Sequence, residues 1–373
     1  MDALTTPSNW QRVRLGDICE VVKGQQINKI SLNNTDKYPV INGGIDFLGY
    51  TNKFNVSKNT IAISEGGTCG YVRFMTSNFW SGGHNYSLQK ISNKVNNLCL
   101  YHILKSYEKD IMKLGVGSGL KNIQLKALKD FEILLPPLNE QIAIANILSD
   151  VDRYLYSLDA LILKKESVKK ALSFELLSQR KRLKGFNQAW QRVRLGDIAN
   201  YLTSNLSAEQ ITQQGKIKVY DVNNFIGYTN TTFISDKPYI SIVKDGSVGR
   251  VRILPPKTNI LSTMSALIAN HKTTTEFLFY LLSNFEFKNF TSGSIIPHIY
   301  FKDYKEKTIF LPPLNEQIAI ANILSGLDNE IISLKNKKRQ FENIKKALNH
   351  DLMSAKIRVL KNKRPKSQGQ TRL

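Results

Sequence analysis

Apolar residues recur at alternating intervals of four and three along two long stretches of the chain. The first stretch has them at Ile144, Leu148, Val151, Leu155, Leu158 and Ile162, and the second at Ile320, Leu324, Leu327, Ile331 and Leu334. This spacing puts one apolar stripe along an α-helix and is typical of helices that pack together along a seam. Four lysines interrupt the stripes, so we expect looser pairing at Lys165, Lys169, Lys338 and Lys345.

The two predicted helices cover residues 138–184 and 314–358. A helix of about 40–45 residues, rising 1.5 Å per residue, spans roughly 60–68 Å. Helices of this length bury an apolar stripe only against each other or against a partner. We expect the two to pack antiparallel, with one globular domain before each.

The segments before the two helices have a different pattern. Short apolar runs with strand character occur at residues 60–64 (TIAIS), 71–75 (YVRFM) and 239–243 (YISIV), separated by turns rich in Gly and Asn. Helix candidates follow at residues 97–111 and 274–287. These features predict two globular domains of mixed α/β type, each with about 130 residues.

The two halves of the chain repeat each other. WQRVRLGDI at residues 10–18 returns at 190–198, and LPPLNEQIAIANILS at 135–149 returns unchanged at 311–325. The matching blocks keep their order, whereas the middle of each half has diverged. The chain is therefore a tandem duplication. We divide it into a globular domain at 1–137, a helix at 138–184, a second globular domain at 185–313, a second helix at 314–358 and a basic tail at 359–373, which composition predicts to be disordered.

The charge balance favours a polyanionic partner. The chain has 52 Lys and Arg residues against 30 Asp and Glu, a formal net charge of +22. Nucleic acid is the first candidate for such a surplus. The N-terminus lacks a signal-peptide pattern, and no run of apolar residues is long enough to span a membrane. The three cysteines have no metal-like spacing and are predicted to be reduced thiols in the cytoplasm.

Motifs for catalysis are missing from the sequence. It contains no P-loop, and the glycines at 66, 67 and 70 do not form G-x-G-x-x-G. In LPPL the prolines are flanked by leucines, which cannot hydrogen bond the amine of a flipped base. We expect no cofactor in this chain and no catalysis by it alone.

The repeated blocks carry a family resemblance. WQRVRLGDI, a Gly-rich turn, LPPLNEQIAIANILS and a long helix, in this order and twice over, resemble the specificity (S) subunit of type I restriction–modification systems. The resemblance implies an α+β fold: two tandem mixed α/β target recognition domains, separated by two long antiparallel, coiled-coil-like helices, with a pseudo-twofold internal repeat. It also implies a bipartite site on double-stranded DNA, with one half read by each domain.

The resemblance further implies partner subunits. Two modification (methyltransferase) subunits would join one such chain, and restriction subunits would be added for cleavage. S-adenosylmethionine, ATP and Mg would belong to those partners. The identical helix starts offer the same docking surface twice, and the candidate partner-binding residues are Leu138, Asn139, Glu140, Gln141, Leu314, Asn315, Glu316 and Gln317.

Polar and basic loop residues are the candidates for DNA contact, because base edges and phosphates are bound by such side chains. In the first half they are Lys23, Gln25, Gln26, Asn28, Thr68, Tyr71, Arg73, His84, Asn85, Tyr86, Ser118, Lys121, Asn122 and Gln124. In the second half they are Ser204, Asn205, Lys244, Ser247, Arg250, Arg252, Ser292, Ser294, His298 and Tyr300. Two alternatives remain: a structural adaptor that organises partner proteins without reading DNA, and a self-sufficient DNA-modifying enzyme.

Overall fold

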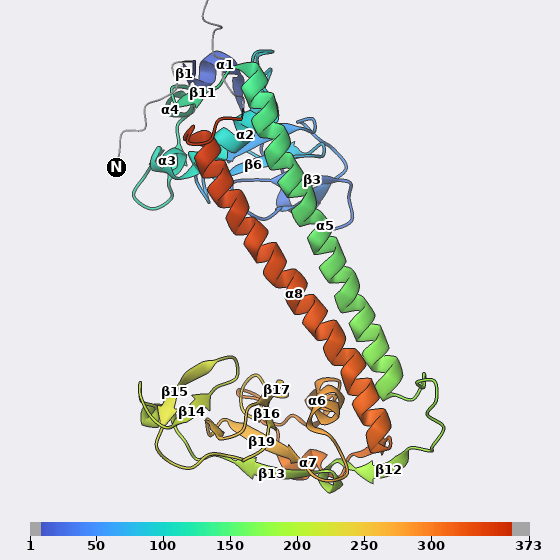
Figure 1. Cartoon of the computed structure of the whole chain (residues 1–373). Coiled ribbons are helices and arrows are strands. Elements are labelled where there is room, and N and C mark those ends of the chain that lie inside the picture. The colour runs from blue at the N-terminus through green and yellow to red at the C-terminus, as the bar shows by residue number, and fades with distance from the viewer. Residues whose placement is uncertain (1–8, 360–373) are drawn as a thin grey trace, which may run out of the picture. The chain divides into compact units, whose positions relative to one another are not determined.

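The computed structural model describes residues 9–359, which fall into two compact units. Unit 1 is formed by residues up to 158 together with those from 337 onward, and unit 2 by residues 159–336. Both long helices, α5 (Leu138–Leu177) and α8 (Leu314–Met353), contribute residues to both units (Figure 1). The predicted basic tail lies outside the described residues, except for Val359.

The long helices begin where the sequence predicts and end earlier. Predicted to reach residues 184 and 358, they stop at Leu177 and Met353. Just beyond these ends, Gln179 and Ala355 have φ angles of 62° and 55°. A residue in this left-handed conformation ends a helix by turning the chain so that later amides reach the last carbonyls. The amide of Lys181 accordingly donates to the carbonyl of Glu175 at 3.1 Å.

Unit 1 contains two main sheets. The first is antiparallel, in the order β2 (Glu20–Lys23), β8 (Asn85–Gln89), β5 (Thr60–Ser64) and β6 (Val72–Met75). The second has the order β4 (Gly49–Thr51), β3 (Tyr38–Ile41) and β7 (Trp80–Ser81), with β3 parallel to β7. β1 (Gln11–Arg14) pairs with β11 (Glu132–Leu135), directly before α5. The short helices are α1 (Leu15–Ile18), α2 (Asn97–Ser106), α3 (Glu108–Lys113) and α4 (Leu125–Lys129).

Unit 2 repeats this topology. Its four-stranded sheet has the order β13 (Ala199–Thr203), β19 (Met264–Ala269), β16 (Tyr239–Val243) and β17 (Val251–Leu254). Its three-stranded sheet has the order β15 (Phe225–Thr229), β14 (Ile217–Tyr220) and β18 (Thr258–Ile260). β12 (Gln191–Arg194) pairs with β20 (Thr308–Leu311), and the helices are α6 (Thr275–Ser283) and α7 (Phe301–Tyr304). The predicted mixed α/β globule, built twice, is confirmed.

The predicted elements match closely. The runs at 60–64 and 239–243 are β5 and β16, and most of 71–75 is β6. The helix candidate at 97–111 is divided at Tyr107 into α2 and α3, because the φ and ψ angles of Tyr107, −88° and 5°, are not helical.

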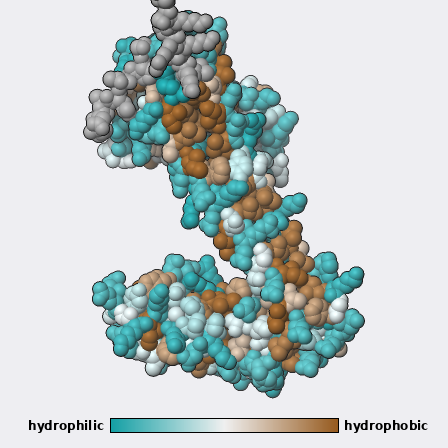
Figure 2. Space-filling model, viewed as in Figure 1, coloured by the Kyte–Doolittle hydropathy of each residue, from teal (hydrophilic) through white to brown (hydrophobic). Residues whose placement is uncertain are grey.

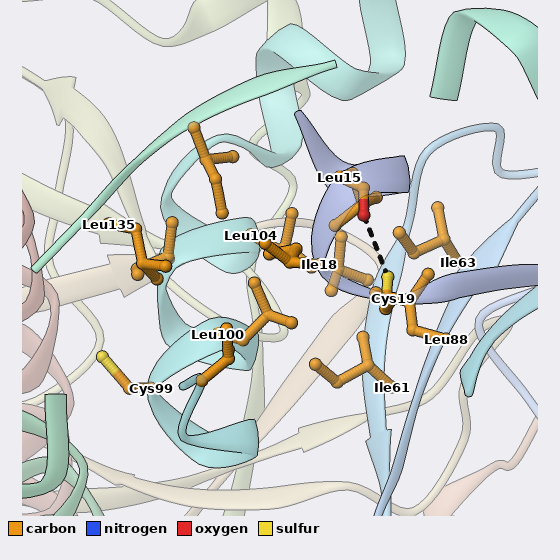
Figure 3. Close-up of a cluster of buried hydrophobic side chains, with 14 of the residues drawn as sticks. Leu15, Ile18, Cys19, Ile61, Ile63, Leu88, Cys99, Leu100, Leu104 and Leu135 are labelled. Atoms are coloured by element: carbon orange, nitrogen blue, oxygen red, sulfur yellow. Dashed lines mark hydrogen bonds between the residues drawn. The ribbon is translucent and has the colours of Figure 1, made fainter. Parts of the chain in front are cut away.

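The core of unit 1 packs α2 and α1 against the four-stranded sheet and the start of α5. Figure 3 shows Leu100 and Leu104 from α2 beside Leu15 and Ile18 from α1, with Ile61 of the sheet opposite. The same cluster takes in side chains from the start of α5 and from the end of α8. Burial raises the pKa of the Cys19 and Cys99 thiols to about 12, and all three cysteines are free thiols.

Within each unit the two long helices run antiparallel. In unit 2, the Lys165 Nζ lies 2.8 Å from a carboxylate oxygen of Glu330, and Lys169 pairs with Asp328. Residue numbers therefore rise along α5 as they fall along α8. In unit 1, the rings of Tyr154 and Phe341 pack with centroids 4.5 Å apart.

The expectation of looser pairing at the lysines is not what the structure shows. Lys165 and Lys169 reach acidic side chains of the opposite helix, and Lys345 does the same with Asp152 in unit 1. Lys338 pairs with Glu342 of its own helix, at 3.7 Å. A long lysine side chain can cover an apolar seam with its methylenes while its ammonium group meets a carboxylate at the edge. Each such surface pair contributes about 0–1 kcal/mol.

His102 makes the stability of unit 1 sensitive to acid. This α2 side chain is 3% exposed, and burial, with a smaller effect of the Lys345 ammonium group, lowers its pKa from 6.5 to about 4. Between these values the unfolded chain binds more protons than the folded one. We therefore expect unit 1 to lose about 2 kcal/mol of unfolding free energy between pH 7 and pH 5 through His102.

Urea unfolding measured at several pH values checks this expectation. The variant His102→Gln should flatten the acid limb of the profile, whereas His271→Gln, at an exposed site in unit 2, should leave it unchanged. An identical acid limb in the His102 variant would contradict the assignment.

Candidate nucleic-acid interface

In unit 1 the loops that carry the candidate DNA-contacting residues meet around the turn that follows β5. The amide of Ile123, in β10 (Asn122–Ile123), donates to the carbonyl of Glu65 at 2.9 Å, and the amide of Glu65 donates to the carbonyl of His84 at 3.0 Å. The amide of Gly24 donates to the carbonyl of Asn85 at 2.8 Å. Backbone hydrogen bonds thus bring segments far apart in the sequence into one loop cluster.

Glu65 is the charged centre of this loop cluster, and no sequence motif pointed to it. It is 8% exposed, and its Oε1 lies 2.6 Å from the Nζ of Lys23 and accepts a hydrogen bond from the Tyr86 hydroxyl at 3.2 Å. The Nδ1 of His84 lies 3.7 Å from Oε2. Burial, assisted by the carboxylate, raises the pKa of Tyr86 to about 12, so its hydroxyl remains a donor. A phosphate that binds Lys23 must compete with Glu65.

Unit 2 builds an equivalent loop cluster. The amide of Ile299 donates to the carbonyl of Lys244 at 2.9 Å, and the amide of Lys244 donates to the carbonyl of Thr263 at 3.1 Å. An acid again faces a histidine, because the Nδ1 of His298 lies 2.7 Å from a carboxylate oxygen of Asp245. The segment that holds Asn205 joins through a bond from the Ser262 amide to the Leu206 carbonyl, at 2.9 Å.

Most candidate DNA-contacting side chains reach the surface of these loop clusters. Those that are exposed are Lys23, Gln25, Gln26, Asn28, His84, Ser118, Lys121, Asn122 and Gln124 in unit 1, and Asn205, Ser247, Arg250, Ser292, Ser294 and Tyr300 in unit 2. Those that are half-buried are Thr68, Tyr71 and Arg73 in unit 1, and Lys244, Arg252 and His298 in unit 2.

Three candidates need correction, because they are buried. Asn85 is 2% exposed and donates to the Ser81 hydroxyl at 3.0 Å, and Tyr86 is 1% exposed. Ser204 is 8% exposed, and its hydroxyl accepts a hydrogen bond from the amide of Leu206 at 3.2 Å. These side chains support the loops from beneath and do not face a ligand.

The strands that follow the two turns carry equivalent arginines that lie over aromatic rings. The Arg73 guanidinium lies 5.0 Å from the ring centroid of Phe47 and 5.4 Å from that of Tyr71. The Arg252 guanidinium lies 5.2 Å from the Tyr220 ring and donates to the carbonyl of Asn223 at 2.9 Å. The ring covers one side of each guanidinium, so it limits the directions from which a phosphate or base can bind.

The repeated block at the start of each long helix forms a clamp inside its own unit. In unit 1, Glu140 is 2% exposed and accepts hydrogen bonds from the Trp10 indole at 3.3 Å and from the Arg358 Nε at 2.9 Å. Trp10 precedes β1, and Arg358 follows α8. The beginning of the globular domain, the start of α5 and the segment after α8 therefore meet at one carboxylate.

Unit 2 has the same clamp with its own residues. Glu316 is 1% exposed and accepts hydrogen bonds from the Trp190 indole at 2.9 Å and from the Arg182 guanidinium at 3.0 and 2.6 Å. Arg182 follows α5, just as Arg358 follows α8. The segment after each long helix thus carries an arginine that binds the glutamate at the start of the other helix.

The neighbouring glutamines tie each helix start to a short helix. Gln141 accepts a hydrogen bond from the amide of Asn96 at 2.7 Å and donates to the carbonyl of Pro136 at 2.7 Å. Gln317 accepts a bond from the amide of Thr274 at 3.0 Å. Asn96 and Thr274 are the N-cap residues of α2 and α6.

The eight candidate partner-binding residues therefore divide into two groups. Four are buried and bonded within their own unit, namely Glu140, Gln141, Glu316 and Gln317. Four are exposed, namely Leu138, Asn139, Leu314 and Asn315. Only the exposed group can meet a partner without opening the clamp. Ile142 and Ile318, one turn further along, extend this surface and are 43% and 46% exposed.

A comparison with family models decides the class of protein. The model described as the type I restriction modification DNA specificity domain matches twice, at residues 7–165 and 187–343. The chain belongs to this DNA specificity family. It is a type I specificity chain with two recognition domains. Each match contains one loop cluster and the tryptophan and glutamate of one clamp, whereas Arg182 and Arg358 lie outside the matched ranges.

Known specificity subunits resemble the chain along most of its length. A putative type I specificity subunit of Mycoplasma genitalium is 33% identical over 258 residues, which cover 65% of this chain and 66% of that protein. A putative type I restriction enzyme specificity subunit of Methanocaldococcus jannaschii is 30% identical over 372 residues, or 91% of this chain and 84% of that one. The crystal structure of the S subunit from M. genitalium superposes with a TM-score of 0.68 at 26% identity, covering 93% and 97% of the two chains.

Among residues 9–359, this specificity chain holds no group of three or more His, Cys, Asp or Glu side chains placed to bind a metal ion. The same residues include no helix long and apolar enough to cross a bilayer.

Proposed function

We propose that each recognition domain reads one half of a bipartite sequence in double-stranded DNA. The observation that carries this proposal is the loop cluster itself. Two homologous units build it on the same strands and turns but place different side chains on it, such as Lys23 and His84 in unit 1 and Asn205 and Arg250 in unit 2. A shared scaffold with different polar side chains suits the reading of two different sequences. The two long helices set the spacing between the halves.

The exposed helix starts dock two methyltransferase subunits. Leu138 and Ile142 lie on one helix and Leu314 and Ile318 on the other, in identical sequence. Figure 2 shows apolar surface along the first turns of α5 in unit 1. Two identical exposed apolar surfaces fit two copies of one partner. In this proposal the chain is not catalytic and works in the cytoplasm, restriction subunits add to the complex, and S-adenosylmethionine, ATP and Mg are bound by the partners.

Segment exchange tests the reading of half-sites. Replacing residues 23–124 by the matching segment of another family member, in the full chain with its methyltransferase partner, should change the first half of the methylated sequence and leave the second unchanged. Each loop cluster is closed by hydrogen bonds within its own unit, which is the physical reason for this independence. Methylation mapping across genomic DNA gives the result.

The reciprocal exchange in unit 2 is the control. It should change only the second half of the motif. If either exchange altered both halves, the modular reading would be wrong. If the unaltered complex showed no sequence preference, the chain would be a structural adaptor instead.

Charged substitutions in the repeated block test the docking of partners. Ile142→Asp or Ile318→Asp alone should leave one methyltransferase subunit bound, and the double variant should leave none. Docking buries only the exposed part of each isoleucine, which contributes about 1 kcal/mol, and an aspartate there must also lose hydration. Each variant should therefore weaken its own site at least about tenfold. Native mass spectrometry gives the stoichiometry. Val168→Asp, at a 45% exposed position of α5 outside the repeat, is the matched control. Two subunits retained on the Ile142 variant would reject this surface.

A further inference from the structure

The same hairpin in both units carries unusually exposed apolar side chains at its tip. In unit 1 the hairpin joins β9 (Gly115–Val116) to β10, and Leu120 at its tip is 79% exposed. In unit 2 the equivalent segment, 292–298, has Ile295 at 92% and Ile296 at 55%. Figure 1 shows the loop after α3 standing out from the body of unit 1. Their own unit leaves most of the surface of Leu120 and Ile295, and about half of that of Ile296, uncovered.

Both hairpins are held firmly at their base. Ile123 and Ile299 donate their amides to the turn after β5 or β16, as described above, and in unit 2 the Gly246 amide also donates to the carbonyl of Pro297 at 2.9 Å. The two sides of the unit 2 hairpin pair directly with each other, because Ser292 and His298 exchange backbone hydrogen bonds of 2.9 and 2.7 Å. The tip therefore projects from an anchored base.

The two tips share their place and apolar character but not their sequence. Aligned without gaps, GSGLKN at 117–122 matches GSIIPH at 293–298, so Leu120 corresponds to Ile296. A single exposed leucine needs no explanation in a globular protein. Leu120 is 79% exposed and Ile296 is 55% exposed, and Ile295, at 92%, stands where unit 1 has Gly119. Both diverged copies thus keep an exposed aliphatic side chain at the tip, which indicates a common task. Ser118 and Lys121 flank Leu120, and a hydroxyl and an ammonium group suit a phosphate backbone.

We propose that each tip is an apolar wedge that enters between stacked base pairs beside the half-site read by its own unit. This inference rests on the proposed function, because it needs duplex DNA on the loop cluster. DNA-binding proteins insert aliphatic side chains at base steps and unstack them. Unstacking next to a target also lowers the energy needed to extrude a base for chemistry. The wedge residues are Leu120 in unit 1 and Ile295 with Ile296 in unit 2.

The test uses the complex with its methyltransferase partner and a duplex that contains its methylated sequence. 2-Aminopurine, whose fluorescence rises when it is unstacked, is placed at successive positions beside each half-site. Binding of the unaltered complex should raise the fluorescence at one step beside each half. Leu120→Ser should abolish the rise beside the first half only, and Ile295→Ser with Ile296→Ser should abolish it beside the second only. Leu120→Met, which stays apolar, should retain the signal.

Each serine variant should also bind the duplex about tenfold more weakly while keeping the bipartite motif, since apolar contact is lost and the base contacts remain. A motif retained without any fluorescence rise in the unaltered complex would overturn the wedge and leave the proposed function standing. Loss of a methyltransferase subunit from the Leu120→Ser complex, with unchanged fluorescence, would make the tip a protein contact and reject the wedge. Absence of sequence-selective binding in the unaltered complex would overturn both.

Discussion

Glu316→Ala is expected to lower the unfolding free energy of unit 2 by about 3–5 kcal/mol. The Glu316 carboxylate is buried and accepts hydrogen bonds from Arg182 and Trp190. Its removal leaves a guanidinium whose side chain is only 30% exposed, and a buried indole N–H, without an acceptor. Such groups lose their bonds to the protein and regain only part of their hydration. Chemical denaturation followed by tryptophan fluorescence measures the change, since Trp190 lies in the clamp.

Glu306→Ala is the matched control for this prediction. Glu306 also pairs with an arginine of unit 2, because its carboxylate lies 3.0 Å from Arg194, but its side chain is 56% exposed. Removing an exposed partner should change stability by about 0–1 kcal/mol. The double variant of Glu316→Ala and Arg182→Ala should lose much less unfolding free energy than the sum of the losses in the two single variants. If Glu316→Ala and Glu306→Ala lowered the free energy of unfolding equally, the buried clamp would stabilise unit 2 no more than an exposed ion pair does.

The clamp also shows what the sequence could not reveal. The identical block predicted a helix start correctly, but its glutamate was assigned to a surface that binds partner subunits. Whether a carboxylate is buried depends on partners far away in the sequence, here Trp10 and Arg358 for Glu140. One signal was available: Arg182 and Arg358 lie 176 positions apart, the same offset as Glu140 and Glu316. Residues kept at one offset across a diverged duplication are candidates for a shared contact.

The sequence predicted the loop clusters only in part, again because burial depends on contacts between residues far apart in the chain. Gly-rich and polar loops were recognised from their composition, and most of the named side chains are exposed. Asn85 and Tyr86 were misjudged because they belong to β8, a central strand of its sheet. Their side chains point to opposite faces of the sheet, and both are buried. Glu65 was missed because a single acid after a strand carries no motif. The early helix ends were missed because Gln179 and Ala355 replace the glycine that usually marks such a position.

Gly70→Ala should destabilise unit 1 by about 2–4 kcal/mol and weaken reading of the first half-site. Gly70 has a φ of +83°, and a Cβ placed there would lie 2.8 Å from the backbone N and Cα of Met112. Neither backbone atom can move without shifting α3. The Gly70 amide also donates to the carbonyl of Ser64 at 2.8 Å and so closes the turn that carries Thr68. Denaturation midpoints and methylation rates measure the two effects.

Two other glycines separate the sources of this loss. Gly246 has a φ of +80°, and no atom lies within 4 Å of a Cβ added there. Gly246→Ala should therefore lower the free energy of unfolding by about 1–2 kcal/mol, which is the cost of the left-handed backbone conformation alone. Gly119 has open space around it and no positive φ, so Gly119→Ala should leave the free energy of unfolding unchanged. If Gly70→Ala were no worse than Gly246→Ala, the close approach to Met112 would be relieved at little cost. The turn that holds the loop cluster would then be soft, and a soft turn could not hold the side chains beside it in the fixed positions that base reading requires.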